Sequence, residues 1–259
     1  MVLLGYAMIC PSASKFKSGT LTISLTDDQK KKYQKQLAMP GLTEDCQARL
    51  MKARILILGA TETAFVCADH LMRLGTGHLE LAGASHYDMH LLAERLDVLH
   101  PQPTDTHVSV ADRTFDAHDS EELIASFDVV VDGLNDWQLK LVASDACMHL
   151  SKPLVHVGGE GFRYQLYTMR PGRSACLRCV FPRIGIDDFP KAQDENALFS
   201  PVQGVLGALQ AIEAAKLAAN FGASQGNELF KFDFLSGEME MITGLDGVAD
   251  CPDCGKRRR

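Results

Sequence analysis

Arg-Ile-Leu-Ile-Leu-Gly, residues 54–59, carries the clearest indication of fold in the chain. Its continuous apolar run is typical of a strand buried on both faces of a parallel sheet, and Gly59 ends it. Residues 63–74 then follow with the composition of a helix, and His-Leu-Glu-Leu, residues 78–81, is a second predicted strand. A strand, a helix and a strand in this order predict two parallel strands joined by a right-handed crossover.

The same alternation continues along the chain in both directions. Two helices are expected before the first strand, at 27–37 and 43–51. After the second strand we expect further helices at 91–99, 121–126 and 136–150, and further strands at 105–110, 129–131 and 154–157. Regular alternation of this kind predicts an α/β fold with a Rossmann-like doubly wound sheet.

The regular alternation of predicted strands and helices ends after residue 160. Residues 164–169 alternate like an antiparallel strand, 202–221 form a long helix rich in Ala and Leu, and 229–235 with 238–242 predict a hairpin. The sheet should therefore be mostly parallel, with antiparallel strands in the C-terminal half. Residues 1–25 show no convincing hydrophobic periodicity of a helix or a strand. We therefore expect an N-terminal extension followed by one domain over residues 26–259.

Composition sets limits on the kind of partner. The chain has 259 residues, 46% of them hydrophobic, which suffices for one sizeable core. A net charge of -7 argues against a nucleic-acid partner. We expect no contact with a membrane, because no apolar run approaches the ~20 residues of a span. Residues 2–10 are apolar but short and follow no basic residue, so we expect a cytoplasmic protein.

Two Cys-x-x-Cys pairs are the sharpest chemical signal. They are Cys176 with Cys179 and Cys251 with Cys254. Four thiolates satisfy a tetrahedral Zn²⁺ completely and leave no position for water, so the predicted zinc site is structural. Such a site would tie the end of the chain to its middle, and metal binding would contribute to folding. The alternative is two redox pairs or unrelated thiols.

Several stretches together resemble a known family. The chain is similar to the family of the molybdopterin-synthase and thiamine-synthesis adenylyltransferases, MoeB, ThiF and HesA, and of the ubiquitin-activating enzymes. The stretches that carry the resemblance are Lys32 to Leu37, Gln47 to Leu50, Ala53 to Gly59, Lys152 to Val155, Gly161 to Leu166, Cys176 to Pro182, Pro201 to Ala211 and Asp250 to Gly255. They run in order from about residue 30 to 255, so the resemblance covers nearly the whole chain.

The resemblance implies a function and its cofactors. Members of this family bind ATP and Mg²⁺ and adenylate the C-terminal glycine carboxylate of a ubiquitin-like or sulfur-carrier protein. Some then pass that carboxylate to a cysteine, and the working unit is usually a dimer. The expected architecture is an N-terminal extension followed by a ThiF/MoeB-like activating-enzyme domain with a four-cysteine zinc site, assembled as a homodimer.

The phosphate and ribose motifs depart from the family pattern. The phosphate loop, Gly-x-Gly-x-x-Gly in the family, reads Gly59-Ala60-Thr61-Glu62-Thr63-Ala64. Only Gly59 remains, and Glu62 adds a charge that repels phosphate. The second strand runs into Ala82-Gly83-Ala84 where the family has an acidic residue for the ribose, and Asp88 is a poor substitute. The segment that grips the triphosphate is shortened.

The metal and transfer motifs depart as well. The metal motif Asp-x-Thr-Asp-Asn becomes Asp132 to Asp136, which puts Asn135 at the magnesium aspartate and Asp136 beside it. The arginine that a partner subunit supplies aligns with Lys35, which keeps the charge and loses the bidentate fork. The transferring cysteine aligns near Gln193.

Three hypotheses follow from this combination. The first is a catalytically degenerate family member that binds a carrier protein or an active relative, with the binding of ATP and Mg²⁺ largely lost. The second is a divergent but active adenylyltransferase, in which Gly59, Lys35, Asn135 and Asp136 contact the nucleotide. The third is a dinucleotide oxidoreductase, which would need more glycines than Gly59.

Overall fold

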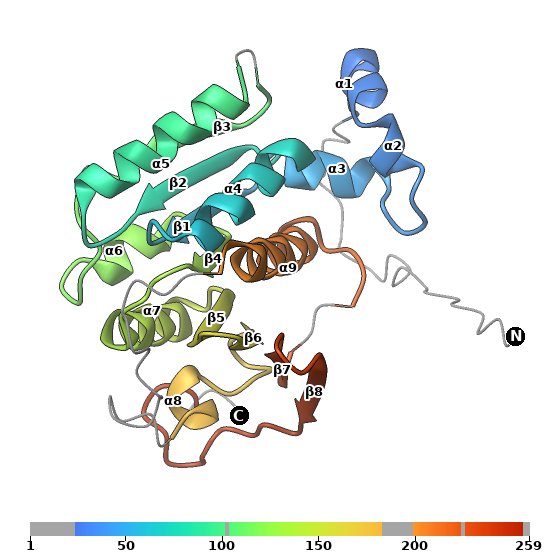
Figure 1. The fold of residues 1–259 in the computed structure, drawn as a ribbon. Coiled ribbons are helices and arrows are strands. Elements are labelled where there is room, and N and C mark those ends of the chain that lie inside the picture. The colour runs from blue at the N-terminus through green and yellow to red at the C-terminus, as the bar shows by residue number, and fades with distance from the viewer. Residues whose placement is uncertain (1–23, 102–103, 183–198, 224–225, 256–259) are drawn as a thin grey trace, which may run out of the picture.

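One eight-stranded sheet organises the part of the chain that the structure describes. The computed structural model of the protein describes residues 24–101, 104–182, 199–223 and 226–255. The strands lie in the order β3-β2-β1-β4-β5-β6-β7-β8 (Figure 1). They are β1 Arg54–Leu58, β2 His78–Ala82, β3 His107–Val110, β4 Val129–Asp132, β5 Leu154–Glu160, β6 Arg163–Met169, β7 Glu228–Asp233 and β8 Glu238–Thr243.

The helices alternate with the strands through the first half of the sheet, as the sequence predicts. They are α1 Asp27–Lys32, α2 Gln34–Leu37, α3 Glu44–Leu50, α4 Glu62–Leu74, α5 His86–Leu99, α6 Ser120–Ala125, α7 Trp137–Leu150, α8 Leu177–Val180 and α9 Ser200–Ala219. Among the described residues, no helix combines the length and the apolar character that crossing a membrane requires.

Strands β1 to β5 pair in parallel, which confirms the Rossmann-like half. Strand β1 lies between β2 and β4, with Leu56 opposite Glu80 on one side and Val130 on the other. The chain builds outward from β1 to β3 and then returns to place β4 on the other side of β1. The carboxyl ends of β1 and β4 therefore diverge at a switch point, where α/β sheets usually bind ligands.

Strands β5 to β8 pair antiparallel, which confirms the predicted C-terminal half. Strands β5 and β6 form a hairpin that closes between Glu160 and Arg163, and β7 and β8 form a second hairpin. Strand β6 pairs with β7, so this half continues the same sheet.

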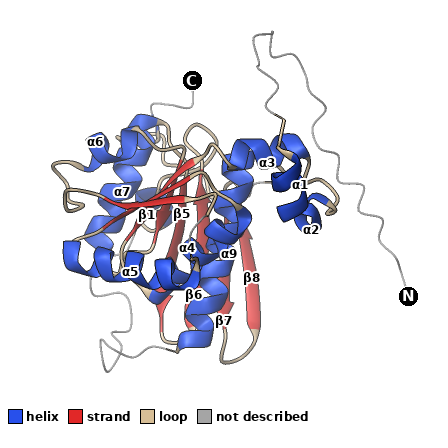
Figure 2. Ribbon diagram, turned by 90° about the horizontal axis from the view of Figure 1, so that it is seen from above, coloured by secondary structure: helices blue, strands red, loops and turns tan. Residues whose placement is uncertain are grey.

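Helices cover both faces of the sheet. Helices α3, α4, α5 and α9 pack on one face and α6 and α7 on the other (Figure 2). Leu177 of α8 belongs to the same apolar cluster as α6 and α7. Each face buries its own apolar cluster, and the side chains of β1 alternate between them: Ile55 and Ile57 in one, Leu56 and Leu58 in the other. Cys67 and Cys147, which lie outside the two Cys-x-x-Cys pairs, are buried among these apolar side chains.

The structure corrects two local predictions and adds one short helix. The helix expected over 27–37 breaks at Tyr33, whose buried side chain donates a hydrogen bond to Asp105 (2.6 Å). Helix α5 begins at His86 rather than near residue 91, because the Ser85 hydroxyl caps it. The short helix α8 was not predicted, since it is a single turn that begins directly after Cys176 and contains Cys179. Of the predicted extension over 1–25, residues 1–23 lie outside the described part, and Leu25 is already buried.

Candidate functional site

A cavity of about 490 Å³ lies at the switch point of the sheet. The loops that follow β1, β2 and β4 form one part of its wall, and one side of α5 forms another. Its lining residues are Gly59, Ala60, Thr61, Ala84, Ser85, Asp88, Met89, Leu91, Leu92, Arg95, Gly133, Leu134, Asn135, Asp136 and Leu139. The structure thus brings together three of the four predicted nucleotide-site residues, Gly59, Asn135 and Asp136.

The loop after β1 lies directly against the loop after β4. Gly59 has φ +92°, and a Cβ atom there would collide with the carbonyl oxygen of Gly133. The Thr61 hydroxyl donates a hydrogen bond to the same carbonyl (3.0 Å) and caps α4 by accepting one from the backbone N–H of Ala64. Gly59 therefore serves a backbone-to-backbone contact between the two loops.

The cation that lines the cavity is held in an ion pair. Nη2 of Arg95 lies 3.0 Å from each carboxylate oxygen of Glu62, at the start of α4. The Arg95 guanidinium also lies over the ring of Phe65, 3.7 Å from its centroid. On the opposite wall, the Asp136 carboxylate caps α7 by accepting hydrogen bonds from the backbone N–H groups of Gln138 and Leu139.

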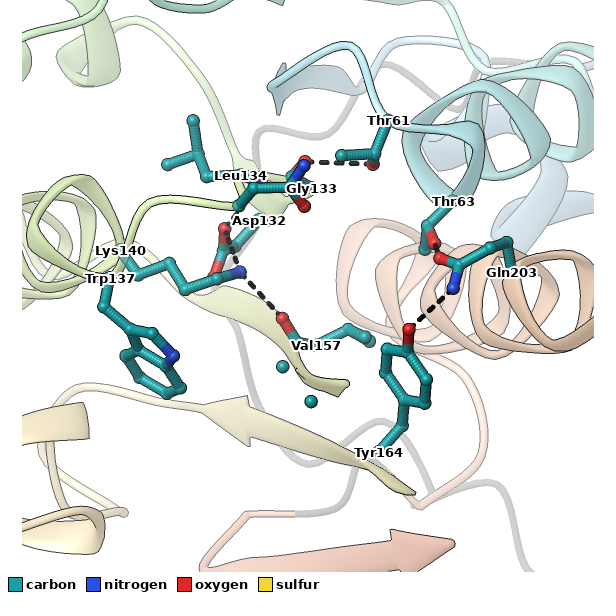
Figure 3. A pocket seen from close by; sticks show the side chains of 13 residues that line it. Thr61, Thr63, Asp132, Gly133, Leu134, Trp137, Lys140, Val157, Tyr164 and Gln203 are labelled. Carbon is teal, nitrogen blue, oxygen red and sulfur yellow. Dashed lines mark hydrogen bonds and ion pairs between the residues drawn. The ribbon is translucent and has the colours of Figure 1, made fainter. Parts of the chain in front are cut away.

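A narrow recess of about 60 Å³ shares Thr61 and residues 133–135 with the larger cavity. Lys140 reaches it from α7 and is buried, with Nζ 3.1 Å from both oxygens of Asp132 and 2.8 Å from the carbonyl of Val157. Figure 3 shows this arrangement, with Trp137 beside Lys140. Nζ of Lys140 thus has as many acceptors as it has protons.

His156 completes this buried polar group. Its Nδ1 lies 2.6 Å from the Asp132 carboxylate, and its ring lies 5.3 Å from that of Trp137. Its Nε2 is buried and has no hydrogen-bond partner among the described residues. Because an ionised carboxylate can only accept, Nδ1 carries the proton and Nε2 a lone pair.

Burial and charge shift the pKa values of these three groups. Burial opposes ionisation of Asp132, but the Lys140 ammonium and the hydrogen bond from His156 outweigh it, so the pKa of the carboxyl is lowered. Burial lowers the pKa of His156, which keeps the imidazole neutral. Burial also lowers the pKa of Lys140, although the Asp132 carboxylate opposes that shift.

The other wall of the recess is a chain of hydrogen bonds between three elements. The Thr63 hydroxyl on α4 donates to the side-chain oxygen of Gln203 on α9. Nε2 of Gln203 donates to the Tyr164 hydroxyl on β6 (2.9 Å). Figure 3 shows these side chains facing Lys140 across the recess. The chain links α4, α9 and β6 along this wall of the recess.

Two sequence-predicted residues lie elsewhere or outside the description. Lys35 is exposed on α2 and is not among the residues that line either cavity of this chain, so its role across a dimer stays a prediction. Gln193 lies outside the described residues. His86 and His90 share the exposed surface of α5, with ring centroids 4.8 Å apart, and His86 Nε2 is 2.7 Å from the carbonyl of Ala111.

Sequence reasoning missed Lys140, His156 and Arg95. A signal existed for the first two. Lys140 lies three and seven residues before Ala143 and Cys147, on the buried side of α7, and His156 interrupts an apolar strand. A charged or polar residue at a buried position requires a partner. No such signal exists for Arg95, because it lies on an exposed side of α5, where an arginine requires no partner.

The two cysteine pairs come together on the face of the sheet that α7 covers. The sulfurs of Cys176, Cys179, Cys251 and Cys254 all lie within 4.8 Å of one another. Those of Cys176 and Cys251 are 3.6 Å apart, as are those of Cys179 and Cys254. Four sulfurs about 2.3 Å from one tetrahedral ion would be about 3.8 Å apart. The cluster therefore fits a zinc ion, and the separations are too long for disulfides.

Comparison with known proteins agrees with this architecture. The sequence model of the ThiF family matches residues 89–253. The adenylyltransferase and sulfurtransferase MOCS3 of Bos taurus is 29% identical over 250 residues, covering 90% of this chain and 55% of the relative. MOCS3 of Arabidopsis thaliana is 25% identical over 268 residues, covering 96% and 57%. The chain thus spans about half the length of these relatives.

Solved structures share the fold at low identity. The crystal structure of E. coli MccB with MccA-N7isoASN gives a TM-score of 0.73 at 15% identity, covering 87% of this chain and 74% of that chain. The structure of MccB with ATP gives 0.66 at 16% identity, covering 82% and 69%. At these identities the likeness concerns the fold alone.

Proposed function

This chain belongs to the ThiF family, and from that premise we propose that it binds a ubiquitin-like or sulfur-carrier protein, or an active relative, without adenylating it. The observation that carries the proposal is that the cation at each of the two cavities is already paired with a carboxylate of the chain. Arg95 is paired with Glu62, and Lys140 is enclosed by Asp132 and Val157. Each cation is therefore already paired with a carboxylate, which weakens its attraction for an incoming triphosphate.

Adenylation needs such cations, because negative charge on the phosphoryl oxygens must be stabilised in the transition state. Removing one preorganised donor from an active site typically costs about 10²–10³ in rate. Pairing of both cations with carboxylates, together with loss of the glycine-rich loop, would therefore suppress the reaction by several orders of magnitude. This reasoning supports a degenerate site.

The metal position supports the same proposal. Asn135 offers Mg²⁺ a neutral oxygen where the family motif has a carboxylate. Asp136 does carry a charge, but its carboxylate already accepts two backbone hydrogen bonds as the cap of α7. We therefore infer that ATP with Mg²⁺ binds weakly here.

We further infer that a structural zinc occupies the cysteine cluster and that the chain works as a homodimer. The zinc follows from the donor set and its spacing. The dimer follows from the family resemblance, and there Lys35 of one subunit would approach the cavity of the other. We also retain a cytoplasmic location as part of this proposal.

Two measurements test the proposal together. Isothermal titration calorimetry should detect binding of a small carrier protein ending in Gly-Gly, encoded near this gene, or of an active relative. ATP–pyrophosphate exchange with the same carrier should stay at the level without protein. Exchange that depends on the carrier would overturn the proposed lack of activity, and failure to bind any such carrier or relative would overturn the binding role.

The alternative is a divergent but active adenylyltransferase. Two observations favour it: the curated relatives are named adenylyltransferases, and the cavity at the switch point keeps a volume of about 490 Å³. In that case Gly59, Asn135 and Asp136 would contact the nucleotide in altered roles. Family membership removes the motivation for the oxidoreductase hypothesis.

A further inference from the structure

We propose that the cavity at the switch point accepts an uncharged ligand, and that the Glu62 carboxylate, acting through Arg95, excludes phosphorylated ones. This inference deepens the proposed function, because it assigns a ligand class to the same cavity. It makes Glu62 a specificity-determining residue. Its evidence is the charge around the cavity, the geometry of the Glu62–Arg95 pair and the nature of the remaining wall.

The charges around the cavity are unfavourable to anions. Of the fifteen lining residues, Arg95 is the cation, and Asp88 and Asp136 carry carboxylates. Glu62 does not line the cavity but neutralises Arg95, the one cation that does. The carboxylates of Asp88 and Asp136 therefore remain as two uncompensated negative charges at the cavity. A phosphate entering this space would meet two like charges without a free cation to offset them.

The geometry of the ion pair explains why Arg95 stays with Glu62. Its Nη2 contacts both carboxylate oxygens, and the face of its guanidinium lies over Phe65. Glu62 is the first residue of α4, where the positive end of the helix dipole favours a carboxylate. A phosphate would have to displace this carboxylate from both the cation and the helix end.

The rest of the wall suits an uncharged molecule with an apolar body. Met89 and Leu92 from α5 and Leu134 after β4 are buried side chains that line the cavity, and Leu139 adds a further apolar surface. Apolar ligand surface buried here would gain about 25 cal/mol per Å². Glu62 itself is not among the lining residues. Replacing it should therefore leave the contacts of an uncharged ligand unchanged.

The test compares adenosine with ATP, with and without Mg²⁺, on three proteins by isothermal titration calorimetry. The proteins are the unaltered chain, Glu62→Gln and Glu94→Gln, which removes an exposed carboxylate beside Arg95 on α5 and so controls for net charge. The unaltered chain should bind adenosine more tightly than ATP. Glu62→Gln should tighten ATP binding roughly tenfold, because Arg95 is released. Adenosine binding should change by less than about twofold, and Glu94→Gln should behave like the unaltered chain.

Several results would overturn the inference. The unaltered chain could bind ATP as tightly as adenosine, or none of the three proteins could bind adenosine. Alternatively, Glu62→Gln could show no gain in ATP affinity, or Glu94→Gln could show an equal gain. Melting temperatures of the variants check that each is folded. The carrier-binding experiment can fail while this one succeeds, because no carrier protein is present here.

Discussion

Asp132 is the residue at which the polar contacts of the narrow recess converge. Its carboxylate accepts hydrogen bonds from Lys140, from His156 and from the backbone N–H of Leu134. Neither Asp132 nor His156 has any exposed surface. Taking two charges out of water is costly, so such a pair adds little net stability, but removing one partner leaves an uncompensated buried charge. Both partners are therefore needed.

Replacing Lys140 with methionine should destabilise the protein by about 3–5 kcal/mol, because Asp132 would keep its burial and lose its cation. The free energy of unfolding in urea measures this loss. The matched control is Lys31→Met on the exposed surface of α1, which should change stability by less than about 0.5 kcal/mol. Equal effects of the two substitutions would contradict the account of the buried pair.

His156 should make stability depend on pH in the mildly acidic range. Its pKa is lowered in the folded protein. Above the unfolded pKa of about 6.5 its contribution is fully present, and as pH falls below that value the unfolded chain takes up a proton that the folded one resists. Urea unfolding between pH 8 and pH 5 should show the loss. His156→Gln should be less stable at pH 8 but lose less between pH 7 and pH 5; an unchanged slope would count against this role.

At the scale of elements, the contact between α4 and α9 positions one wall of the narrow recess and the Glu62 carboxylate that pairs with Arg95. Helix α4 carries Glu62 and Thr63, and α9 carries Gln203. The two helices cross closely at Gly207, where a Cβ atom would lie 2.5 Å from the carbonyl oxygen of Thr63 and 2.8 Å from Cβ of Val66. A glycine is needed there because the backbone of α4 occupies the space of a side chain.

Two glycines of α9 should therefore respond in opposite ways to alanine. Gly207→Ala should cost about 1–3 kcal/mol, since the added methyl group must push the helices apart. Gly204 has nothing within 4 Å of its Cβ position, so Gly204→Ala should stabilise the helix by up to about 1 kcal/mol. Thermal unfolding of both variants measures the difference. Stabilisation by Gly207→Ala would show that the helices can separate freely.

For the whole molecule, the cysteine cluster joins distant parts of the chain. Cys176 caps the start of α8 after β6 and Cys179 lies within this helix, whereas Cys251 and Cys254 follow β8 near the end of the chain. A metal ion bound by all four holds the segment after β8 against the face of the sheet that α7 covers. Since the unfolded chain has no such preformed site, metal binding stabilises the fold as a whole.

Purified protein should contain about one zinc per chain by elemental analysis. Removing it with a chelator, or substituting Cys254→Ser, should lower the melting temperature by roughly 10 °C or more. The control is Cys67→Ala, a buried cysteine of α4 outside the cluster, which should leave the zinc content unchanged. Protein purified without zinc and insensitive to chelators would refute the zinc assignment.

The sheet and the cysteine cluster can be read from the sequence alone. Residues 55–58 and 129–131 predict buried parallel strands because a strand covered on both faces must be apolar at every position. The spacing of Cys176 with Cys179 and of Cys251 with Cys254 predicts the cluster because a two-residue gap directs both sulfurs to one side. The buried strands and the cysteine cluster can be predicted because each depends on a pattern within a few neighbouring residues.

The tertiary structure decided which charges meet. Glu62 and Arg95 are 33 positions apart, His156 and Asp132 are 24 apart, and the break at Tyr33 depends on Asp105. Each of these contacts forms between residues of separate elements, so no local sequence pattern predicts it. Electrostatic energy depends on distance in space and on burial, and neither quantity exists until the sheet and its helices have assembled.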